Sequence, residues 1–541
     1  MKDMSAWNEG DWIAAISLIV LAGFLAVGAM VAMSKKDEAF GHPKGLYMLF
    51  FAEMWERFSY YGMRALLIFY LTQHWLFNDA KSNLIYGAYT SLVYITPVLG
   101  GYLADRYLGQ RKAVLFGGIL LAAGHSLMAV EGVGGQNDPT INVFWAALAF
   151  IIVGSGFLKA NISVMVGQLY RLTDIRRDGA YTIFYMGINL GAAIGTILVG
   201  YLGQTIGWGF GFGLAGIGML AGLAVFVLGK KALLGNGEAP MPLSRSKEMT
   251  LYGVGLAAVA VIWALVQYQD IIQNLLIVSG LALLGYVIYE AFKLDKHPRD
   301  RIFAILFLIA LNPLFWGLFE QAGGSFNLYT DRYVDRAGVP ASIFQSINPI
   351  YIIILAPLFA GLWVMLGRRG LEPSAPAKFG LALAQVGLGF LVFVWGANSV
   401  GAEVMTPVVF VFLLYFLHTT AELCLSPVGL SAMNRLAPKF MASLIMGAWF
   451  YMTAVGNFVA GKIGEATGGE GGEMTKEATL SIYSKIGWIT IGVSAVVLLV
   501  SPLIKKLMHL DTLEDDQNLV GHSGVGEPQA AGTKPESEVK V

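Results

Sequence analysis

The sequence predicts an all-α membrane protein with many spanning helices. Hydrophobic residues make up 56% of the 541 residues and charged residues only 13%, and the mean hydropathy is +0.63. The apolar residues fall into blocks of about 20 to 30 residues, the length that an α-helix needs to cross a bilayer. Loops with charged residues, Gly or Pro separate these blocks. We therefore expect the lipid bilayer to surround most of the chain.

Charge and cysteine content argue against several other classes of protein. Lys and Arg together number 36, as do Asp and Glu, so the net charge of zero gives no reason to expect nucleic-acid binding. The single cysteine, Cys424, cannot form an intrachain disulfide and has no thiol or histidine neighbours at metal-ligand spacing. We expect neither a metal site nor a cofactor.

Fifteen apolar segments are expected to be membrane helices. The first, 12–33, is too long for a cleaved signal peptide and is preceded by only one basic residue, so we interpret it as an extra helix. The remaining segments are 45–74, 83–105, 111–131, 141–168, 179–204, 209–230, 249–268, 271–293, 301–330, 341–367, 377–398, 405–434, 440–466 and 478–507.

These segments divide the chain into five parts. Residues 1–44 hold the extra N-terminal membrane helix and a cytoplasmic linker, and residues 45–230 form a six-helix bundle. Residues 231–300 are a linker with two inserted membrane helices, and residues 301–507 form the second six-helix bundle. Residues 508–541 are polar and rich in Gly, Glu and Pro, a composition typical of a disordered tail.

An internal repeat relates the two bundles. Three short matches occur at offsets of 260 to 266 residues, which indicates a duplicated six-helix unit with the substrate at the interface of the repeats. The matches are Pro97-x-x-x-Gly101 with Pro357-x-x-x-Gly361, Trp55-Glu56 with Phe319-Glu320, and Phe184-Tyr185-Met186 with Phe450-Tyr451-Met452.

Basic residues predict the orientation of the chain. They gather in alternate loops, which are therefore expected to be cytoplasmic, with the N-terminus outside and the C-terminus inside. The residues concerned are Arg106, Arg111, Lys112, Arg171, Arg176, Arg177, Lys296, Arg368, Arg369, Arg435, Lys439, Lys505 and Lys506.

Charged side chains near the middle of apolar segments are the main functional signal. Glu53, Glu56, Arg57 and Tyr60 share one helix face, because residues three, four and seven apart lie on the same side. Each charge costs roughly 2.5–3.5 kcal/mol to insert, so such groups must pair, titrate or face water. Lys159, Glu320 and Glu422 occupy similar depths in other segments. A structural ion-pair network is the alternative; for the whole set we favour a substrate and proton pathway.

The signs of these charges suggest the substrate. Arg57 and Lys159 lie in the first half and Glu320 and Glu422 in the second, so a cavity between the halves would have one cationic and one anionic wall. Such a cavity fits a small zwitterion. His418, one turn from Glu422, could share its proton or be a neutral core histidine. Polar and aromatic groups nearby could hydrogen-bond a peptide backbone or simply pack: Tyr60, Tyr61, Tyr94, Asn161, Asn189, Asn348 and Trp449.

The loop Gly101-Tyr-Leu-Ala-Asp105-Arg106-Tyr-Leu-Gly109-Gln-Arg111-Lys112 resembles the signature loop of the major facilitator superfamily, G-x-x-x-D-R-x-x-G-x-R-K. We interpret Asp105, Arg106 and Arg111 as a latch that holds helix ends together in one conformation; an ordinary positive-inside loop is the alternative. The resemblance implies a major facilitator fold of two six-helix bundles; the two helices between the bundles and the N-terminal helix at 12–33 are expected as additions to that fold.

Further motifs resemble the proton-dependent oligopeptide transporter family. Its pattern E-x-x-E-R-F-x-Y-Y-G is complete at Glu53–Gly62, and F-Y-x-x-I-N-x-G is complete at Phe184–Gly191. F-E-Q occurs at Phe319–Gln321 and E-L-x-x-S-P-x-G-L at Glu422–Leu430. The resemblance extends over about residues 45–507.

The family implies an alternating-access symporter of the bacterial inner membrane that imports di- and tripeptides with protons. Arg57 and Lys159 would face the peptide carboxylate, with Glu53 and Glu56 coupled to them, and Glu422 would hold the peptide amino terminus. Glu320 would be a proton site whose salt bridge controls closure of the cavity. The pocket would be lined by Tyr60, Tyr61, Tyr94, Asn189, Asn348 and Trp449. We expect a monomer, with an oligomer as the alternative.

Two other functions are alternatives to peptide transport. A carrier of nitrate or another anion could use the same scaffold, although relatives that do not transport peptides tend to lack Glu53 and Glu56 of the first motif. A membrane enzyme would need a nucleophile or metal constellation, and none of the His, Cys or Asp spacings supplies one.

Overall fold

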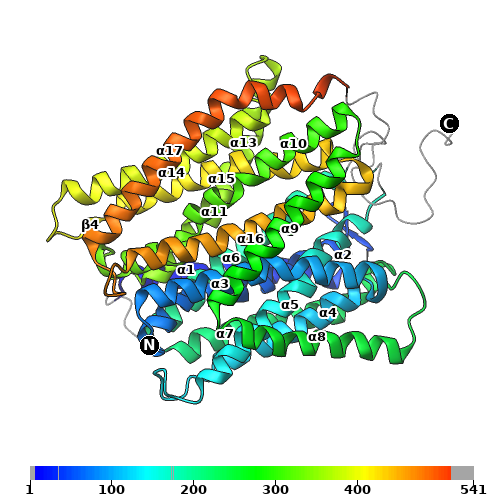
Figure 1. The fold of residues 1–541 in the computed structure, drawn as a ribbon. Coiled ribbons are helices and arrows are strands. Elements are labelled where there is room, and N and C mark those ends of the chain that lie inside the picture. Colours follow the sequence, from blue (N-terminus) through cyan, green and yellow to red (C-terminus); the bar gives the residue numbers. More distant parts are fainter. Residues whose placement is uncertain (1–6, 35, 172–173, 175, 513–541) are drawn as a thin grey trace.

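The computed structural model describes residues 7–34, 36–171, 174 and 176–512, and nearly all of these are helical. Figure 1 shows the N-terminal half (blue and cyan) lying beside the C-terminal half (yellow to red), with α9 crossing between them. Two short β-ladders, Glu38–Ala39 with His42–Pro43 and Val334–Asp335 with Thr406–Pro407, are the strands of the described chain.

The helices match the expected segments in order. In the first half and the linker they are α1 Glu9–Met33, α2 Lys44–Phe69, α3 Asp79–Leu103, α4 Gln110–Met128, α5 Ile141–Gln168, α6 Arg177–Thr205, α7 Trp208–Leu228, α8 Arg245–Leu265 and α9 Gln269–Phe292. In the second half they are α10 Lys296–Ala310, α11 Asn312–Phe319, α12 Ser325–Tyr333, α13 Ile347–Arg368, α14 Ala375–Ser399, α15 Val409–Leu436, α16 Ala442–Thr467 and α17 Lys476–Leu507.

Thirteen helical segments of the described chain are long and apolar enough to cross a membrane. The α2 and α4 segments are not among them, and α2 carries four charged side chains beyond its first residue: Glu53, Glu56, Arg57 and Arg64. The expected multi-pass architecture is confirmed. The polar tail expected from residue 508 lies outside the described residues from 513 onward, whereas Leu510–Thr512 form a 3-10 turn beside Arg301 of α10.

The segment expected at 301–330 is not one continuous helix. It is divided into α10, α11 and α12, with a 3-10 turn at Glu320–Gly323. Pro313 lies in the first turn of α11, where the N–H that proline lacks would have no partner within the helix. At Gly323, an added Cβ would lie 1.8 Å from the Tyr86 hydroxyl oxygen, so only glycine lets α3 approach this turn. The break places Glu320 on a turn in the middle of the span.

The two halves meet along α3 with α16 and along α6 with α13. A Cβ on Gly87 of α3 would lie 2.6 Å from the Cα of Gly461 in α16, so these helices cross at backbone contact distance. The pairing of the second helix of each bundle with the fifth helix of the other follows from the predicted repeat. The site described below lies between these two seams.

The three extra helices lie at the periphery. Helix α1 packs on α6 and α2, and α8 packs on α5. Asn8 and Asp11 form a capping box at the start of α1, and the Tyr201 hydroxyl of α6 donates a hydrogen bond to Asp11. The outer side of α1 exposes large apolar side chains such as Ile19 and Met33, as expected for a helix in contact with lipid.

Candidate functional site: a charged cavity between the halves

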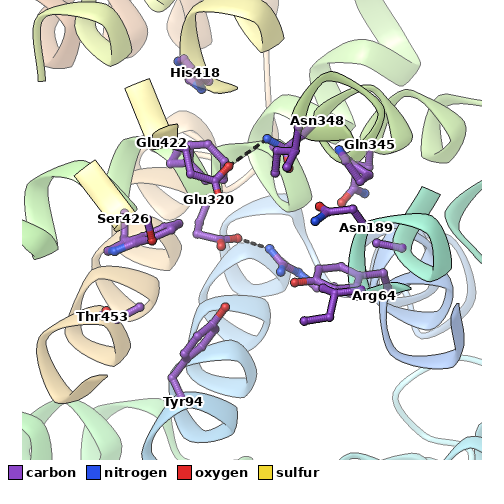
Figure 2. Close-up of a pocket in the computed structure, with 18 of the residues that line it drawn as sticks. Arg64, Tyr94, Asn189, Glu320, Gln345, Asn348, His418, Glu422, Ser426 and Thr453 are labelled. Carbon is purple, nitrogen blue, oxygen red and sulfur yellow. Dashed lines mark hydrogen bonds and ion pairs between the residues drawn. The ribbon is translucent and has the colours of Figure 1, made fainter. Parts of the chain in front are cut away.

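A cavity of about 270 Å³ lies between the two halves (Figure 2). Helices α2, α3 and α6 contribute from the first half, and α11, α13, α15 and α16 from the second. Seven of the predicted site residues line it, as does His418: the seven are Tyr61, Tyr94, Asn189, Glu320, Asn348, Glu422 and Trp449.

An ion pair joins the halves inside this cavity. Arg64 of α2 donates from Nη2 to the Glu320 carboxylate, and its Nε donates to the Tyr86 hydroxyl at 2.5 Å. Both members of the pair are buried, with 7% of Arg64 and 5% of Glu320 exposed. Breaking a buried pair of this kind costs about 3–5 kcal/mol because it leaves one charge uncompensated. The pair therefore holds the two halves together at this level.

Arg64 was not among the predicted site residues. It lies one turn beyond Tyr60 on the same face of α2, and its partner Glu320 is 256 residues away along the chain. Its position inside an apolar segment was the available signal, because an intramembrane cation needs an anion close by. No pattern in the sequence told which of the four intramembrane glutamates that anion would be.

Glu422 makes no ion pair with any cation among the described residues. Its Oε2 accepts a hydrogen bond from Asn348 Nδ2 at 3.1 Å, and the same amide lies 3.0 Å from Thr419 Oγ1 (Figure 2). In the described part of the chain, neither Lys nor Arg pairs with this carboxylate. Glu320 and Glu422 thus face Arg64 as two carboxylates against one guanidinium. The arrangement leaves room for one further positive charge.

Behind the cavity wall lies a second charged cluster. Arg57 Nη2 is 2.6 Å from Glu53 Oε1, and Arg57 Nε is 3.2 Å from Glu56 Oε2. The two glutamates are 1% and 0% exposed, and Glu53 Oε2 and both Glu56 oxygens have no hydrogen-bond partner within the described residues. Two buried carboxylates thus share a single guanidinium, and burying a charge is costly unless it is fully paired or neutralised by a proton.

Lys159 and Tyr60 complete this inner cluster. Lys159 Nζ lies 3.9 Å from the centre of the Tyr60 ring and 5.4 Å from that of Tyr94. Tyr60 is 1% exposed. The predicted convergence of all six charges on one cavity is therefore not seen: Glu320 and Glu422 line it, whereas Glu53, Glu56, Arg57 and Lys159 do not. Tyr94, whose ring lies near Lys159, also lines the cavity.

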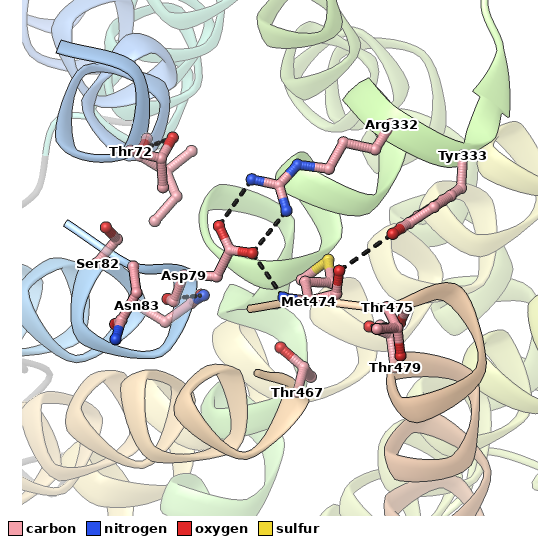
Figure 3. A network of polar contacts seen from close by, with 12 residues as sticks. Thr72, Asp79, Ser82, Asn83, Arg332, Tyr333, Thr467, Met474, Thr475 and Thr479 are labelled. Atoms are coloured by element: carbon pink, nitrogen blue, oxygen red, sulfur yellow. Dashed lines mark hydrogen bonds and ion pairs between the residues drawn. The ribbon is translucent and has the colours of Figure 1, made fainter. Parts of the chain in front are cut away.

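A second connection between the halves lies at the end of the molecule where α3 begins (Figure 3). Arg332 of α12 binds the buried Asp79 through both nitrogens, with Nη1–Oδ2 at 2.6 Å and Nη2–Oδ1 at 2.7 Å. The Met474 amide donates to Asp79 Oδ2 at 2.6 Å, and Tyr333 donates to the Met474 carbonyl at 3.1 Å. Burial and the neighbouring Asp79 carboxylate raise the pKa of Glu473. We name this set, Asp79 with Arg332 and Met474, the outer lock, because the alternation of basic loops predicts that this end of the molecule faces outside.

The signature loop makes contacts within its own half. Asp105 Oδ1 accepts a hydrogen bond from Gln110 Nε2 at 2.7 Å, and Arg106 lies 5.8 Å from the centre of the Tyr102 ring. Arg111 binds Glu238 of the 234–244 linker at 2.6 and 3.0 Å, and this hydrogen bonding lowers the pKa of Glu238. In this structure the loop joins the first bundle to the linker.

Apolar helices in two related halves around a charged central cavity define a membrane transporter of the major facilitator fold. Residues 111–469 match the POT family profile. The chain belongs to the POT family, as its four motifs indicated.

Relatives of known name agree with this assignment. The chain is 38% identical over 487 residues to the uncharacterized transporter YclF of Bacillus subtilis, covering 87% of this chain and 96% of YclF. It is also 38% identical over 456 residues to the peptide transporter YePEPT of Yersinia enterocolitica, covering 79% and 88%. A crystal structure of a POT family transporter in complex with a thioalcohol-conjugated peptide superposes with a TM-score of 0.74 at 32% identity, over 86% of this chain and 97% of that one. The predicted fold and family are confirmed, and the enzyme alternative is excluded.

Proposed function

We propose that this protein is a proton-coupled symporter that imports di- and tripeptides across the bacterial inner membrane by alternating access. The observation that carries the proposal is the unpaired Glu422 beside the interhalf pair of Arg64 and Glu320 in one cavity. Cavities that enclose small molecules have volumes of roughly 300–1,000 Å³, and this one, at about 270 Å³, lies just below that range, so only a short peptide is expected to fit. The named relatives that transport peptides support the same substrate class.

The peptide ammonium is assigned to the anionic wall. Glu422 can accept a charge-assisted hydrogen bond there, with Asn348 holding its carboxylate in place. The peptide carboxylate then points toward the cationic side, where Arg57 and Lys159 lie behind the tyrosines and Arg64 lies in front. Tyr61, Tyr94, Asn189 and Trp449 supply hydrogen bonds and packing to the backbone without selecting one side chain.

Glu320 is proposed as the coupling proton site. A proton on this carboxylate would remove its charge and release Arg64, which could then bind the peptide carboxylate. The proton and the peptide would therefore favour the same state of the carrier, which is the thermodynamic condition for coupled transport. Glu53 and Glu56 form the alternative proton site because they share one Arg57.

The remaining roles follow from position. Asp105, Arg106 and Arg111 are proposed to act as a conformational latch through the linker residue Glu238. The N-terminus is placed outside and the C-terminus in the cytoplasm, because the basic loops alternate. The monomer is proposed as the transport unit, because the residues of one chain are sufficient to form the cavity.

The decisive experiment is uptake of labelled dialanine into liposomes that contain the purified protein. We expect accumulation with an inward proton gradient and its collapse when a protonophore is added. Unlabelled nitrate is the matched competitor for the anion-carrier alternative. Dialanine that never accumulates, together with nitrate uptake by folded protein, would overturn the proposal.

Glu422→Gln is expected to weaken binding of peptides with a free amino terminus. Removing one member of a desolvated charge pair costs about 2 kcal/mol or more, so the KM for dialanine should rise roughly thirtyfold. N-acetylated dialanine, which lacks the ammonium, should inhibit dialanine uptake equally weakly in the wild-type protein and in the variant. Glu465→Gln, whose carboxylate pairs with the half-exposed Lys462 away from the cavity, is the control. If the substitution weakened the binding of N-acetylated dialanine as much as that of dialanine, the peptide ammonium would not bind at Glu422.

A further inference from the structure

A second cavity, of about 550 Å³, lies mainly in the C-terminal half. It is enclosed by the later turns of α13 and α15, the start of α14 and the end of α17, with Tyr185 of α6 contributed by the first half. The helix ends and loops here carry Arg368, Arg369 and Arg435 and are predicted to be cytoplasmic. The cavity therefore lies where the inner surface of the membrane is expected. The features of this cavity described below do not depend on which solute the protein transports.

Cations outnumber anions in this cavity. Lys378 is only 6% exposed, pairs with the Glu372 carboxylate and lies with Nζ 4.2 Å from the centre of the Trp363 ring. Arg435 and Lys505 also line the cavity, and neither makes an ion pair within the described residues. Three cations thus face one carboxylate.

The helix start at Ser374 adds to this positive field. Ser374 lines the cavity and caps α14, accepting a hydrogen bond from the Ala377 amide at 3.4 Å. The N-terminus of a helix carries a partial positive charge and attracts anions. Here that end lies in the same cavity as Lys378, one turn further along α14. The cap, the buried lysine and the two unpaired cations all favour an anionic ligand.

Apart from Ser431 and Tyr185, the remaining lining is apolar. Phe359, Leu423, Leu436 and Met508 form much of the wall. A free inorganic anion would leave this surface without a partner, whereas an amphiphile would cover it while its head group meets the cations. Basic pockets between helices on the cytoplasmic side are suited to anionic lipid head groups.

We propose that this cavity binds an anionic phospholipid, with its phosphate on Lys378, Arg435 and Lys505 and its apolar part against Phe359 and Trp363. Glu372 occupies the lysine when the lipid is absent, so lipid and carboxylate compete for the same ammonium. This competition predicts opposite effects for two neighbouring substitutions: loss of the lysine weakens lipid binding, and loss of the glutamate charge strengthens it.

The test is native mass spectrometry of the full chain titrated with phosphatidylglycerol and, separately, with phosphatidylcholine. Lys378→Met and Arg435→Gln should each weaken phosphatidylglycerol binding about fivefold, the effect of one basic residue near an anionic lipid. Glu372→Gln should strengthen it. Phosphatidylcholine should bind equally to all variants. Arg435 is exposed, so its variant keeps the test valid even if the buried Lys378 variant fails to fold.

Lys293→Met is the matched control. Lys293 also pairs with a glutamate, Glu290 at 2.8 Å, and lies 4.1 Å from the centre of a Tyr289 ring, but it does not line this cavity. Equal phosphatidylglycerol affinity in wild type, Arg435→Gln and Glu372→Gln would overturn the proposal. A different result would be that inorganic phosphate at millimolar concentration displaces the lipid while the Lys378, Arg435 and Glu372 substitutions still change lipid affinity. That result would assign the cavity to a soluble oxyanion instead.

Discussion

Glu320→Gln is expected to abolish proton-driven accumulation of peptide while peptide counterflow continues. The amide cannot release or accept the coupling proton, but it can still accept a hydrogen bond from Arg64 and preserve the shape of the cavity. Uptake with a proton gradient should therefore fall to the level seen without one. Exchange of internal unlabelled peptide for external labelled peptide needs no net proton movement and should persist.

Both measurements belong in the same liposome preparation, so that a loss of folded protein affects them equally. Glu403→Gln, an exposed substitution between α14 and α15, serves as the control and should leave accumulation intact. If the Glu320 variant still accumulates dialanine in response to the gradient, the proton site moves to Glu53 and Glu56. Their glutamine variants would then be expected to show the phenotype.

Asp79→Asn is expected to open the outer lock. The substitution removes the charge that holds both Arg332 nitrogens and weakens the acceptor of the Met474 amide. Because Arg332 is 32% exposed, the loss is smaller than for a fully buried pair, about 2 kcal/mol. That shift changes the closed-to-open equilibrium roughly thirtyfold.

A cysteine at Ser82 can report this opening. Ser82 is fully buried beside Asp79 in the closed lock, and the native Cys424 can be replaced by serine to leave one thiol. Labelling by a membrane-impermeant maleimide should become roughly thirtyfold faster in the Asp79 variant.

The control is Asp331→Asn, because Asp331 pairs with Arg336 at 3.1 Å within the same half. It should leave the labelling rate unchanged. An unchanged rate in the Asp79 variant itself would show that other contacts keep this face closed.

The fold was predictable because hydropathy acts locally. Blocks of apolar residues long enough to span a bilayer predict the helices directly, and the repeat predicts a duplicated six-helix unit. The Arg57–Glu53 pair was equally accessible, since its members lie four residues apart on one helix. The interruption near Glu320 was not, because it depends on Tyr86 of another helix packing against Gly323.

The ion-pair partner of each charged side chain could not be predicted from the residues near it in the sequence. Arg64 and Glu320 meet only when two halves of the chain assemble, and Asp79 and Arg332 lie at segment ends, where charged residues are expected anyway. Charge signs predicted opposed walls, but not that Arg57 and Lys159 would be absent from the cavity lining, with Lys159 against the rings of Tyr60 and Tyr94. Which charged side chains line the cavity depends on how the helices pack in three dimensions.

The two interhalf ion pairs lie at different depths, one in the cavity and one at the outer lock. An empty carrier that turns back to the outside must give up both at once, with no solute to compensate Arg64. A carrier that returns with peptide on board has a replacement anion for that guanidinium. The slow step of net import is therefore expected to be the unloaded return, and peptide placed inside the vesicle should accelerate entry of peptide from outside.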